Sequence, residues 1–117
     1  TVGILGITFK ENCPDIRNSK VVDLVKELES WGTNVIVSDS WADREEVKLE
    51  YGIELGEVSA INPVDALVVA VGHAEYRDLQ PEALKPLCRS DRPVLADVKA
   101  LYDRHVVAEA GFTVFRL

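Results

Sequence analysis

The chain has 117 residues, a length that suits one domain with a core of its own. Hydrophobic residues make up 47% of it and charged residues 28%, a composition that excludes an intrinsically disordered chain. The net charge of -7 argues against nucleic acid as a partner, because a phosphate backbone would be repelled, but one small anionic ligand needs only local positive charge.

No apolar run approaches the roughly 20 residues that a membrane span requires. No signal peptide is recognisable either, so we expect a soluble, cytoplasmic protein without a membrane partner. Cys13 and Cys88 have neither CxxC spacing nor the Cys/His spacing of a zinc site, so we expect free thiols and no structural metal. The chain begins within an apolar run, residues 1–5, which leads us to expect a domain cut from a longer protein.

The first predicted elements are a strand and a helix joined by a long loop. Residues 2–7 have the apolar pattern of a strand. The helix is expected to have Asn18 or Ser19 as its N-cap and to end at Gly32. Its buried stripe is predicted from apolar side chains at helical spacing, namely Val21, Leu24, Val25, Leu28 and Trp31.

A second strand and a second helix follow. The strand is predicted at residues 34–38, and a more charged helix at 42–51, between Ser40 and Gly52. Residues 53–55 are a candidate for a short extra strand.

The strongest strand pattern is residues 66–71 (ALVVAV), which are apolar throughout, as a strand buried on both faces should be. We therefore expect this strand at the centre of the sheet. Pro81 suits a first helical turn, ahead of a helix that Pro86 keeps short. The remaining predicted elements are a strand at 94–98, a helix at 102–110 that Gly111 ends, and a strand at 113–117.

Strands that alternate with helices predict an α/β fold, with a doubly wound, mostly parallel, Rossmann-like sheet of five or six strands and helices on both faces. We expect residues 1–117 to form a single domain. Sheets of this kind bind ligands in the crevice beyond the carboxyl ends of their strands. The loops that can carry a site are therefore those after Gly6, Ser38, Val71 and Val98.

The loop after the first strand, residues 7–18 (ITFKENCPDIRN), is unusually long for a connection between a strand and a helix. It carries Lys10 and Arg17 ahead of a helix N-terminus, where free N–H groups and the helix dipole favour an anion. Two cations in this position predict a site for a phosphorylated ligand. A second interpretation stays open, in which Lys10 and Arg17 pair with Glu11 and Asp15 on a solvated surface.

Other polar side chains follow the predicted strands. Lys99 should project into the same crevice, or else pair with Asp97 at the surface. Asp39 ends the second strand, where a loop or cap role is favoured over a ribose contact. His73 follows the central strand and could touch a ligand or a neighbouring domain, although a loop hydrogen bond is the simpler interpretation. His105 is expected to be exposed.

No catalytic machinery is recognisable in the chain. The pair Gly3-x-x-Gly6 is not the GxGxxG of a dinucleotide site, and no GxxxxGK[ST] phosphate loop is present. Lys10 and Arg17 lie near Cys13 in sequence, but neighbouring acidic residues offset the positive field that a reactive thiolate needs. We therefore expect a structural role for this cysteine.

The stretch at residues 6–19 (GITFKENCPDIRNS) resembles the opening of the C-terminal domain of the nucleotide-sugar 6-dehydrogenases, the UDP-glucose/GDP-mannose dehydrogenase family. The Phe-Lys…Asp-x-Arg pattern is quite specific. The version with Glu-Asn-Cys-Pro-Asp is most similar to the bacterial enzymes that act on UDP-N-acetylhexosamines. Looser matches extend the resemblance over essentially the whole chain, at residues 38–39, 71–73 and 95–99.

The resemblance implies a UDP-sugar-binding domain of an NAD-dependent dehydrogenase, which oxidises the C6 alcohol of a UDP-sugar to the uronate for surface polysaccharide precursors. Phe9 and Lys10 would contact the UDP, and Arg17 would reach toward the NAD pyrophosphate. Lys99 would stand where many members carry arginine against the nucleotide. Lysine keeps the charge there but lacks the bidentate fork of arginine.

The resemblance also implies which parts of the enzyme lie upstream. NAD would be bound mainly by an N-terminal domain of the same chain, and the catalytic cysteine would lie in a segment between the domains. Cys13 should therefore not take the nucleophile's role, and the fragment by itself is expected to be inactive. The full-length protein is expected to be a homo-oligomer.

Two other classes of function remain open. A receiver-like signalling domain shares the α/β alternation and could use Lys99 at a strand end. However, Phe9 and Lys10 stand where its acidic pair should be, and Val71 and Gly72 end the strongest strand without a phosphoacceptor aspartate. The second alternative is a non-catalytic protein-interaction module, which the sequence does not exclude.

Overall fold

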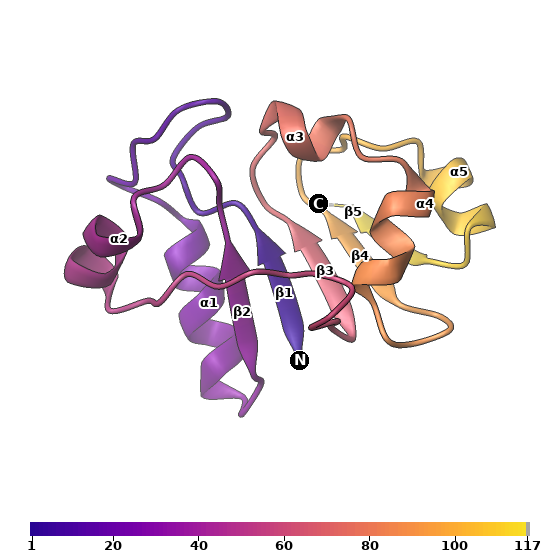
Figure 1. Ribbon diagram of the computed structural model, residues 1–117, viewed down its shortest axis with the longest axis horizontal. Coiled ribbons are helices and arrows are strands. Elements are labelled where there is room, and N and C mark those ends of the chain that lie inside the picture. Colours follow the sequence, from indigo (N-terminus) through magenta and orange to yellow (C-terminus); the bar gives the residue numbers. More distant parts are fainter. Residues whose placement is uncertain (117) are drawn as a thin grey trace.

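The predicted strands form one parallel sheet (Figure 1). The structure is a computed structural model that describes residues 1–116. Its strands are β1 (Val2–Leu5), β2 (Val35–Ser38), β3 (Ala66–Val69), β4 (Val94–Asp97) and β5 (Thr113–Arg116). Its helices are α1 (Val21–Ser30), α2 (Arg44–Tyr51), α3 (Ala74–Arg77), α4 (Pro81–Leu84), the 3-10 turn η1 (Lys85–Leu87) and α5 (Arg104–Glu109).

The strand order is β2-β1-β3-β4-β5, and every neighbouring pair is parallel. β3 is thus the middle strand, which confirms the central position predicted for residues 66–71. The candidate strand at 53–55 supplies only a single bridge, between Leu55 and Val37. The last predicted strand is found as far as Arg116, and Leu117 lies outside the described residues.

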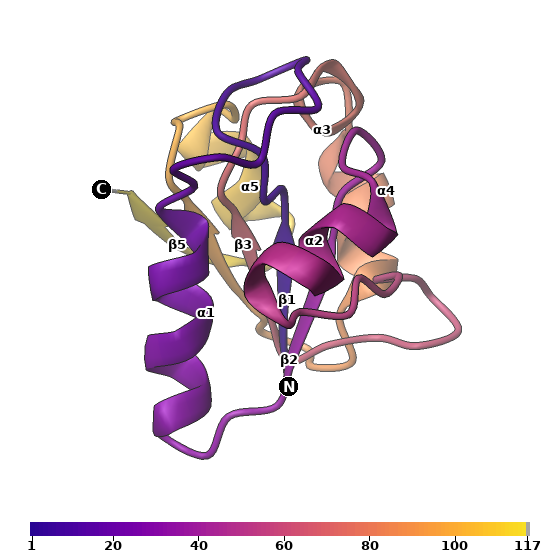
Figure 2. The same cartoon turned by 90° about the vertical axis from the view of Figure 1, so that its left-hand side faces the viewer.

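Each face of the sheet has its own buried apolar cluster, because alternate side chains of a strand point to opposite faces. On one face Val25 of α1 joins the cluster that contains Ile4 of β1. On the other face Leu84 of α4 joins the cluster that contains Leu67 of β3, together with residues of α3 and α5. Figure 2 shows α1 and α4 on opposite sides of the sheet, which confirms the prediction of helices on both faces.

The central strand is less buried than its apolar sequence predicts. Leu67 and Val69 are fully buried, but Ala66 and Val68, on the α1 face, are only partly covered. The cluster on that face contains no residue of β4 or β5. The helices α1 and α2 cover this face mainly over β1 and β2, so the central strand is fully buried on one face and partly buried on the other.

The predicted N-cap of the first helix is also wrong. Ser19 turns its hydroxyl to the carbonyl oxygen of Ile7, and Asn18 has a φ of 58°, so neither side chain caps α1. Lys20 holds the N-cap position without a side-chain hydrogen bond. Ser19 instead ties the end of the long loop to its beginning. Trp31 is 71% exposed and lies beyond α1, so it does not extend the buried stripe.

Helices α2 and α5 each follow an aspartate N-cap and start two residues later than predicted. The Asp43 carboxylate accepts the N–H groups of Glu45 and Glu46 at 2.9 and 3.1 Å, and Asp103 caps α5 in the same way. Such a carboxylate satisfies N–H groups that have no partner inside the helix. Helix α3 was not predicted, since one turn of four residues shows no periodic pattern. Pro86 lies in η1, directly after the short helix α4, as predicted.

A glycine at the end of β1 brings two loops together. β1 and β3 each stop two residues before the predicted end. Gly6 has a φ of 102°, and a Cβ atom on it would lie 2.6 Å from the Cβ of Val71. Only glycine allows the loops after β1 and β3 to pass this closely. The crossing places the loop that carries Lys10 over the carboxyl ends of both strands.

Candidate functional site

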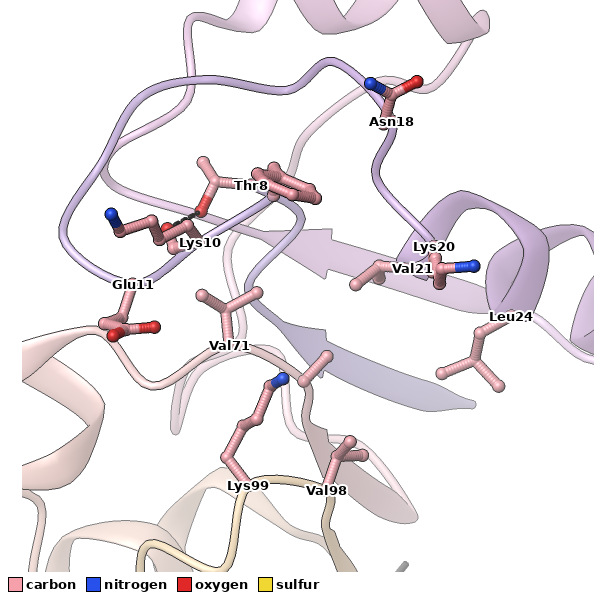
Figure 3. A pocket seen from close by; sticks show the side chains of 12 residues that line it. Thr8, Lys10, Glu11, Asn18, Lys20, Val21, Leu24, Val71, Val98 and Lys99 are labelled. Atoms are coloured by element: carbon pink, nitrogen blue, oxygen red, sulfur yellow. Dashed lines mark hydrogen bonds between the residues drawn. The ribbon is translucent and has the colours of Figure 1, made fainter.

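A pocket of about 460 Å³ opens at the carboxyl ends of the central strands (Figure 3). The loop after β1 and the first turns of α1 form its walls, and the ends of the loops after β3 and β4 complete it. Its volume lies within the roughly 300–1,000 Å³ of small-molecule sites. The pocket is the crevice in which parallel sheets bind ligands.

Three lysines from separate segments line this pocket: Lys10 on the loop after β1, Lys20 before α1 and Lys99 after β4. Among residues 1–116, none of these ammonium groups has a carboxylate oxygen within 4.0 Å. The alternative pairing of Lys10 with Glu11 is thus not present there. The sequence reasoning missed Lys20, although its position directly before a helix N-terminus was a usable signal. Three such cations favour an anionic ligand.

Lys99 does not pair with Asp97, because that carboxylate is occupied. Its two oxygens accept the backbone N–H groups of Leu101 and Tyr102, each at 2.9 Å. Figure 3 shows the Lys99 side chain extending toward the loop that carries Lys10. The structure therefore brings together two of the cations that the sequence predicted for one site.

The remaining surface of the pocket is largely apolar. Phe9 lies on the loop after β1, with 58% of its surface exposed. A flat aromatic ring beside aliphatic side chains can pack on a heterocycle or a sugar, while nearby cations take phosphate groups. The aliphatic lining consists of Val21, Leu24, Ala70, Val71 and Val98.

Arg17 lies apart from the three lysines. Its guanidinium donates to both carboxylate oxygens of Asp15, from Nε at 3.0 Å and from Nη2 at 3.1 Å. This hydrogen bonding holds the pKa of Asp15 below its ordinary value and raises that of Arg17. Arg17 borders a different hollow, beside Tyr51 and the N-terminus of α1. The structure thus does not place it with Phe9, Lys10 and Lys99.

A buried polar cluster lies beneath the loop after β1. One carboxylate oxygen of Asp39 accepts the N–H groups of Ile7 and Thr8, and the other accepts those of Trp41 and Ala42. Asp39 thus has the loop role that the sequence favoured, since it joins the loops after β1 and β2.

His73 belongs to the same buried cluster. It is fully buried and contacts Asp39, Thr8 and the backbone of Asn12. It therefore makes loop hydrogen bonds, the simpler of the two interpretations. The sequence signal for this cluster was a polar residue after each of two apolar strands, Asp39 directly after β2 and His73 two residues after the predicted strand at 66–71.

Neither cysteine lines the pocket. Cys13 and Cys88 are free and partly buried, and burial raises the pKa of Cys88 to about 11. His105 is exposed, as expected. Within residues 1–116, no three His, Cys, Asp or Glu side chains are grouped as metal ligands would be. No helix of that part of the chain combines the length and the hydropathy needed to cross a membrane.

Comparison with known families gives a match over most of the chain. Residues 3–104 match the UDP binding domain of the UDP-glucose/GDP-mannose dehydrogenase family. The UDP-N-acetyl-D-glucosamine 6-dehydrogenase of Salmonella typhi is 46% identical over 100 residues, covering 85% of this chain and 23% of that protein. The protein of the same name from Pseudomonas aeruginosa is 40% identical over 100 residues, covering 86% of this chain and 24% of its own. The chain thus spans about a quarter of the length of these relatives.

Solved structures share the fold. The NDP-N-acetyl-D-galactosaminuronic acid dehydrogenase from Methanosarcina mazei Go1 superposes with a TM-score of 0.86 at 23% identity, covering 98% of this chain and 24% of that one. The UDP-D-ManNAc dehydrogenase from Pyrococcus horikoshii gives 0.75 at 19% identity, with coverages of 98% and 24%. The predicted Rossmann-like fold is thereby confirmed. The family match does not favour a receiver-like domain or an interaction module.

Proposed function

This chain belongs to the UDP-glucose/GDP-mannose dehydrogenase family, and we propose that residues 1–117 are the UDP-sugar-binding, C-terminal domain of an NAD-dependent nucleotide-sugar 6-dehydrogenase. The observation that supports this most directly is the pocket at the strand ends, where three lysines without a carboxylate partner in residues 1–116 stand beside an apolar wall. The names of the two bacterial relatives favour a UDP-N-acetylhexosamine as the substrate.

In the intact enzyme the C6 alcohol of the sugar would become a carboxylate. Two hydrides go to two NAD+ molecules, and water supplies the second carboxylate oxygen, so that four electrons leave the sugar. NAD would be bound mainly by an N-terminal domain of the same chain, and the full-length protein would be a homo-oligomer in the cytoplasm. The uronate would serve as a precursor of surface polysaccharide.

We assign the pocket residues to the nucleotide. Lys10 and Lys99 would hold the diphosphate, with Lys20 as a third cation at the N-terminus of α1. Phe9 would pack against the UDP. Arg17 lies outside this pocket and would contact the NAD pyrophosphate, since its side chain, although paired with Asp15, is 81% exposed and can face another domain.

Substitution of Lys10 in the full-length enzyme tests this proposal. A hydrogen bond to a charged group contributes about 1.5–3 kcal/mol, so Lys10→Ala should weaken the binding of the UDP-sugar roughly 10- to 150-fold in calorimetry. Lys99→Ala should act in the same direction but less strongly. Lys48→Ala is the matched control, because Lys48 pairs with Glu54 outside the pocket and its removal should leave binding unchanged.

Binding of the UDP-sugar by Lys10→Ala as tightly as by the unmodified enzyme would show that the pocket is not the nucleotide site. The isolated chain should produce no NADH with any UDP-sugar, because neither a dinucleotide fingerprint nor the catalytic thiol is part of it. NADH production that depends on Cys13 would contradict this expectation.

A further inference from the structure

His73 and Asp39 are buried ionisable side chains whose hydrogen bonds reach the loop that carries Lys10, and His73 is the one of the two that bonds to Asn12, beyond Lys10. It lines none of the pockets described above, so it cannot touch a ligand in them directly. Trp41 and Tyr76 flank its ring, with ring centroids 5.8 and 5.5 Å away. Any influence of His73 on the ligand must therefore pass through the loop.

The hydrogen bonds of His73 define which ring nitrogen is the acceptor. The backbone N–H of Asn12 donates to Nδ1 at 2.9 Å, so Nδ1 is unprotonated and the proton of the neutral ring is on Nε2. Nε2 lies 3.0 Å from Oδ2 of Asp39, which is therefore the acceptor of that proton. Asp39 thus orients the ring so that Nδ1 faces the loop.

Two loop residues are held by this arrangement, one on each side of Lys10. Asn12 gives its N–H to His73, and its side-chain oxygen accepts the N–H of Ala74 at 2.8 Å. Thr8 lies 3.1 Å from Nε2 of His73 and donates its hydroxyl to the carbonyl oxygen of Lys10 at 3.0 Å, the bond dashed in Figure 3. The segment that presents Phe9 and Lys10 is therefore tied to the loop after β3 at both of its ends.

We propose that His73 is a positioning residue that holds the 8–12 segment in its ligand-binding conformation before the ligand arrives. The proposal rests on the function assigned to Lys10. A segment that is already ordered loses little conformational entropy on binding, whereas a loosened one must be ordered at the expense of affinity. His73 thus acts on the affinity for the nucleotide, through Asn12 and Thr8, and not on the chemistry at C6.

Two substitutions in the full-length enzyme separate the contacts of His73. His73→Asn keeps an oxygen acceptor near the position of Nδ1, facing the N–H of Asn12. His73→Gln keeps an N–H donor near the position of Nε2, facing Asp39, but has no acceptor for Asn12. We expect His73→Gln to bind UDP about tenfold more weakly than His73→Asn, the effect of one ordinary hydrogen bond. Both variants should show a similar loss of thermal stability.

The kinetic readout distinguishes positioning from a general loss of structure. With UDP-N-acetyl-D-glucosamine as the substrate, His73→Gln should raise KM and leave kcat unchanged, because the bound nucleotide orders the segment. Equal affinities of the two variants, or affinities that follow thermal stability alone, would overturn the proposal. Asn12→Gly serves if the histidine variants do not fold, because glycine adopts a φ of 54° without strain. This variant keeps the N–H that donates to His73, removes the side-chain bond to Ala74 and so loosens the same segment. It should also weaken UDP binding, and unchanged binding would count against the proposal.

Lys10→Ala, measured alongside, separates this proposal from the proposed function. If Lys10→Ala weakens UDP binding and His73→Gln does not, the positioning role is wrong and the nucleotide site stands. If neither variant affects UDP binding, the assignment of the pocket to the nucleotide is wrong, and the positioning role fails with it.

Discussion

The two halves of the loop between β1 and α1 are held in place by different means. Residues 7–12 begin with one buried apolar side chain, Ile7, and beyond it they are anchored by buried polar contacts to Asp39 and His73. Residues 13–18 are anchored by one buried apolar side chain, Ile16, and by the hydroxyl of Tyr51, which donates to the Ile16 carbonyl. The backbone N–H of Phe9 donates to the Asp15 carbonyl at 2.7 Å and joins the two halves.

The two halves also differ in whether their cation has a carboxylate partner. Lys10, in the polar-anchored half, has no carboxylate partner within residues 1–116 and lines the pocket. Arg17, in the half anchored by Ile16, is paired with Asp15 and lies at the surface. Directional hydrogen bonds set the position of the cation that must meet a ligand, whereas apolar burial keeps the rest of the loop on the domain.

The largest change in stability is expected when the polar anchor, Asp39, is removed. Asp39→Ala leaves four backbone N–H groups and His73 without their acceptor, so it should lower the free energy of unfolding by about 3–5 kcal/mol in urea denaturation. Asp43→Ala is the matched control, because Asp43 also accepts two backbone N–H groups but at an exposed helix start. It should cost about 0.5–2 kcal/mol. Equal losses in both variants would mean that burial of the anchor adds nothing.

Removal of the apolar anchor should lower the free energy of unfolding by a comparable amount but leave the polar contacts of residues 7–12 in place. Ile16→Ala removes a side chain that is only 1% exposed and should cost about 2–5 kcal/mol, whereas Ile61→Ala, at a site 96% exposed, should change stability by no more than about 0.5 kcal/mol. Hydrogen exchange of the backbone N–H of Asn12, which donates to His73, should stay slow in Ile16→Ala and become fast in Asp39→Ala. Fast exchange in both variants would show that the two halves open together.

The smallest expected effect concerns the exposed ion pair. The Arg17 guanidinium holds the pKa of Asp15 below its ordinary value of 3.8, so the pair contributes stability above that pH and loses it as the pH falls through the lowered pKa. Because both groups are exposed to solvent, the change in stability should be slight. In Arg17→Ala, NMR titration of Asp15 should show its pKa returning toward the ordinary value. A titration curve that does not move would mean that the pair is not populated in solution.

Much of the fold was predictable because its signals are local. The unbroken apolar run at 66–71 predicted the central strand, and alternation of strands with helices predicted the parallel sheet. The long loop with Lys10 was recognisable from its length and charge. Helix starts were less accurate. Asp43 and Asp103 cap α2 and α5, which start two residues later than predicted, and Ser19 bonds to the Ile7 carbonyl oxygen instead of capping α1, because the path of the chain brings that oxygen close.

The sequence by itself determined the order of the elements, the edge of the sheet at which a site can form, and the lysines on two of the loops there. Tertiary structure alone decided which side chains meet. Lys20 lines the pocket and Arg17 does not, although both residues lie shortly before α1 in the sequence. His73 contacts Thr8 across 65 residues of chain, and Asp39 contacts His73 across 34. Such pairings depend on how the loops after β1, β2 and β3 pass one another, and no local pattern records that crossing.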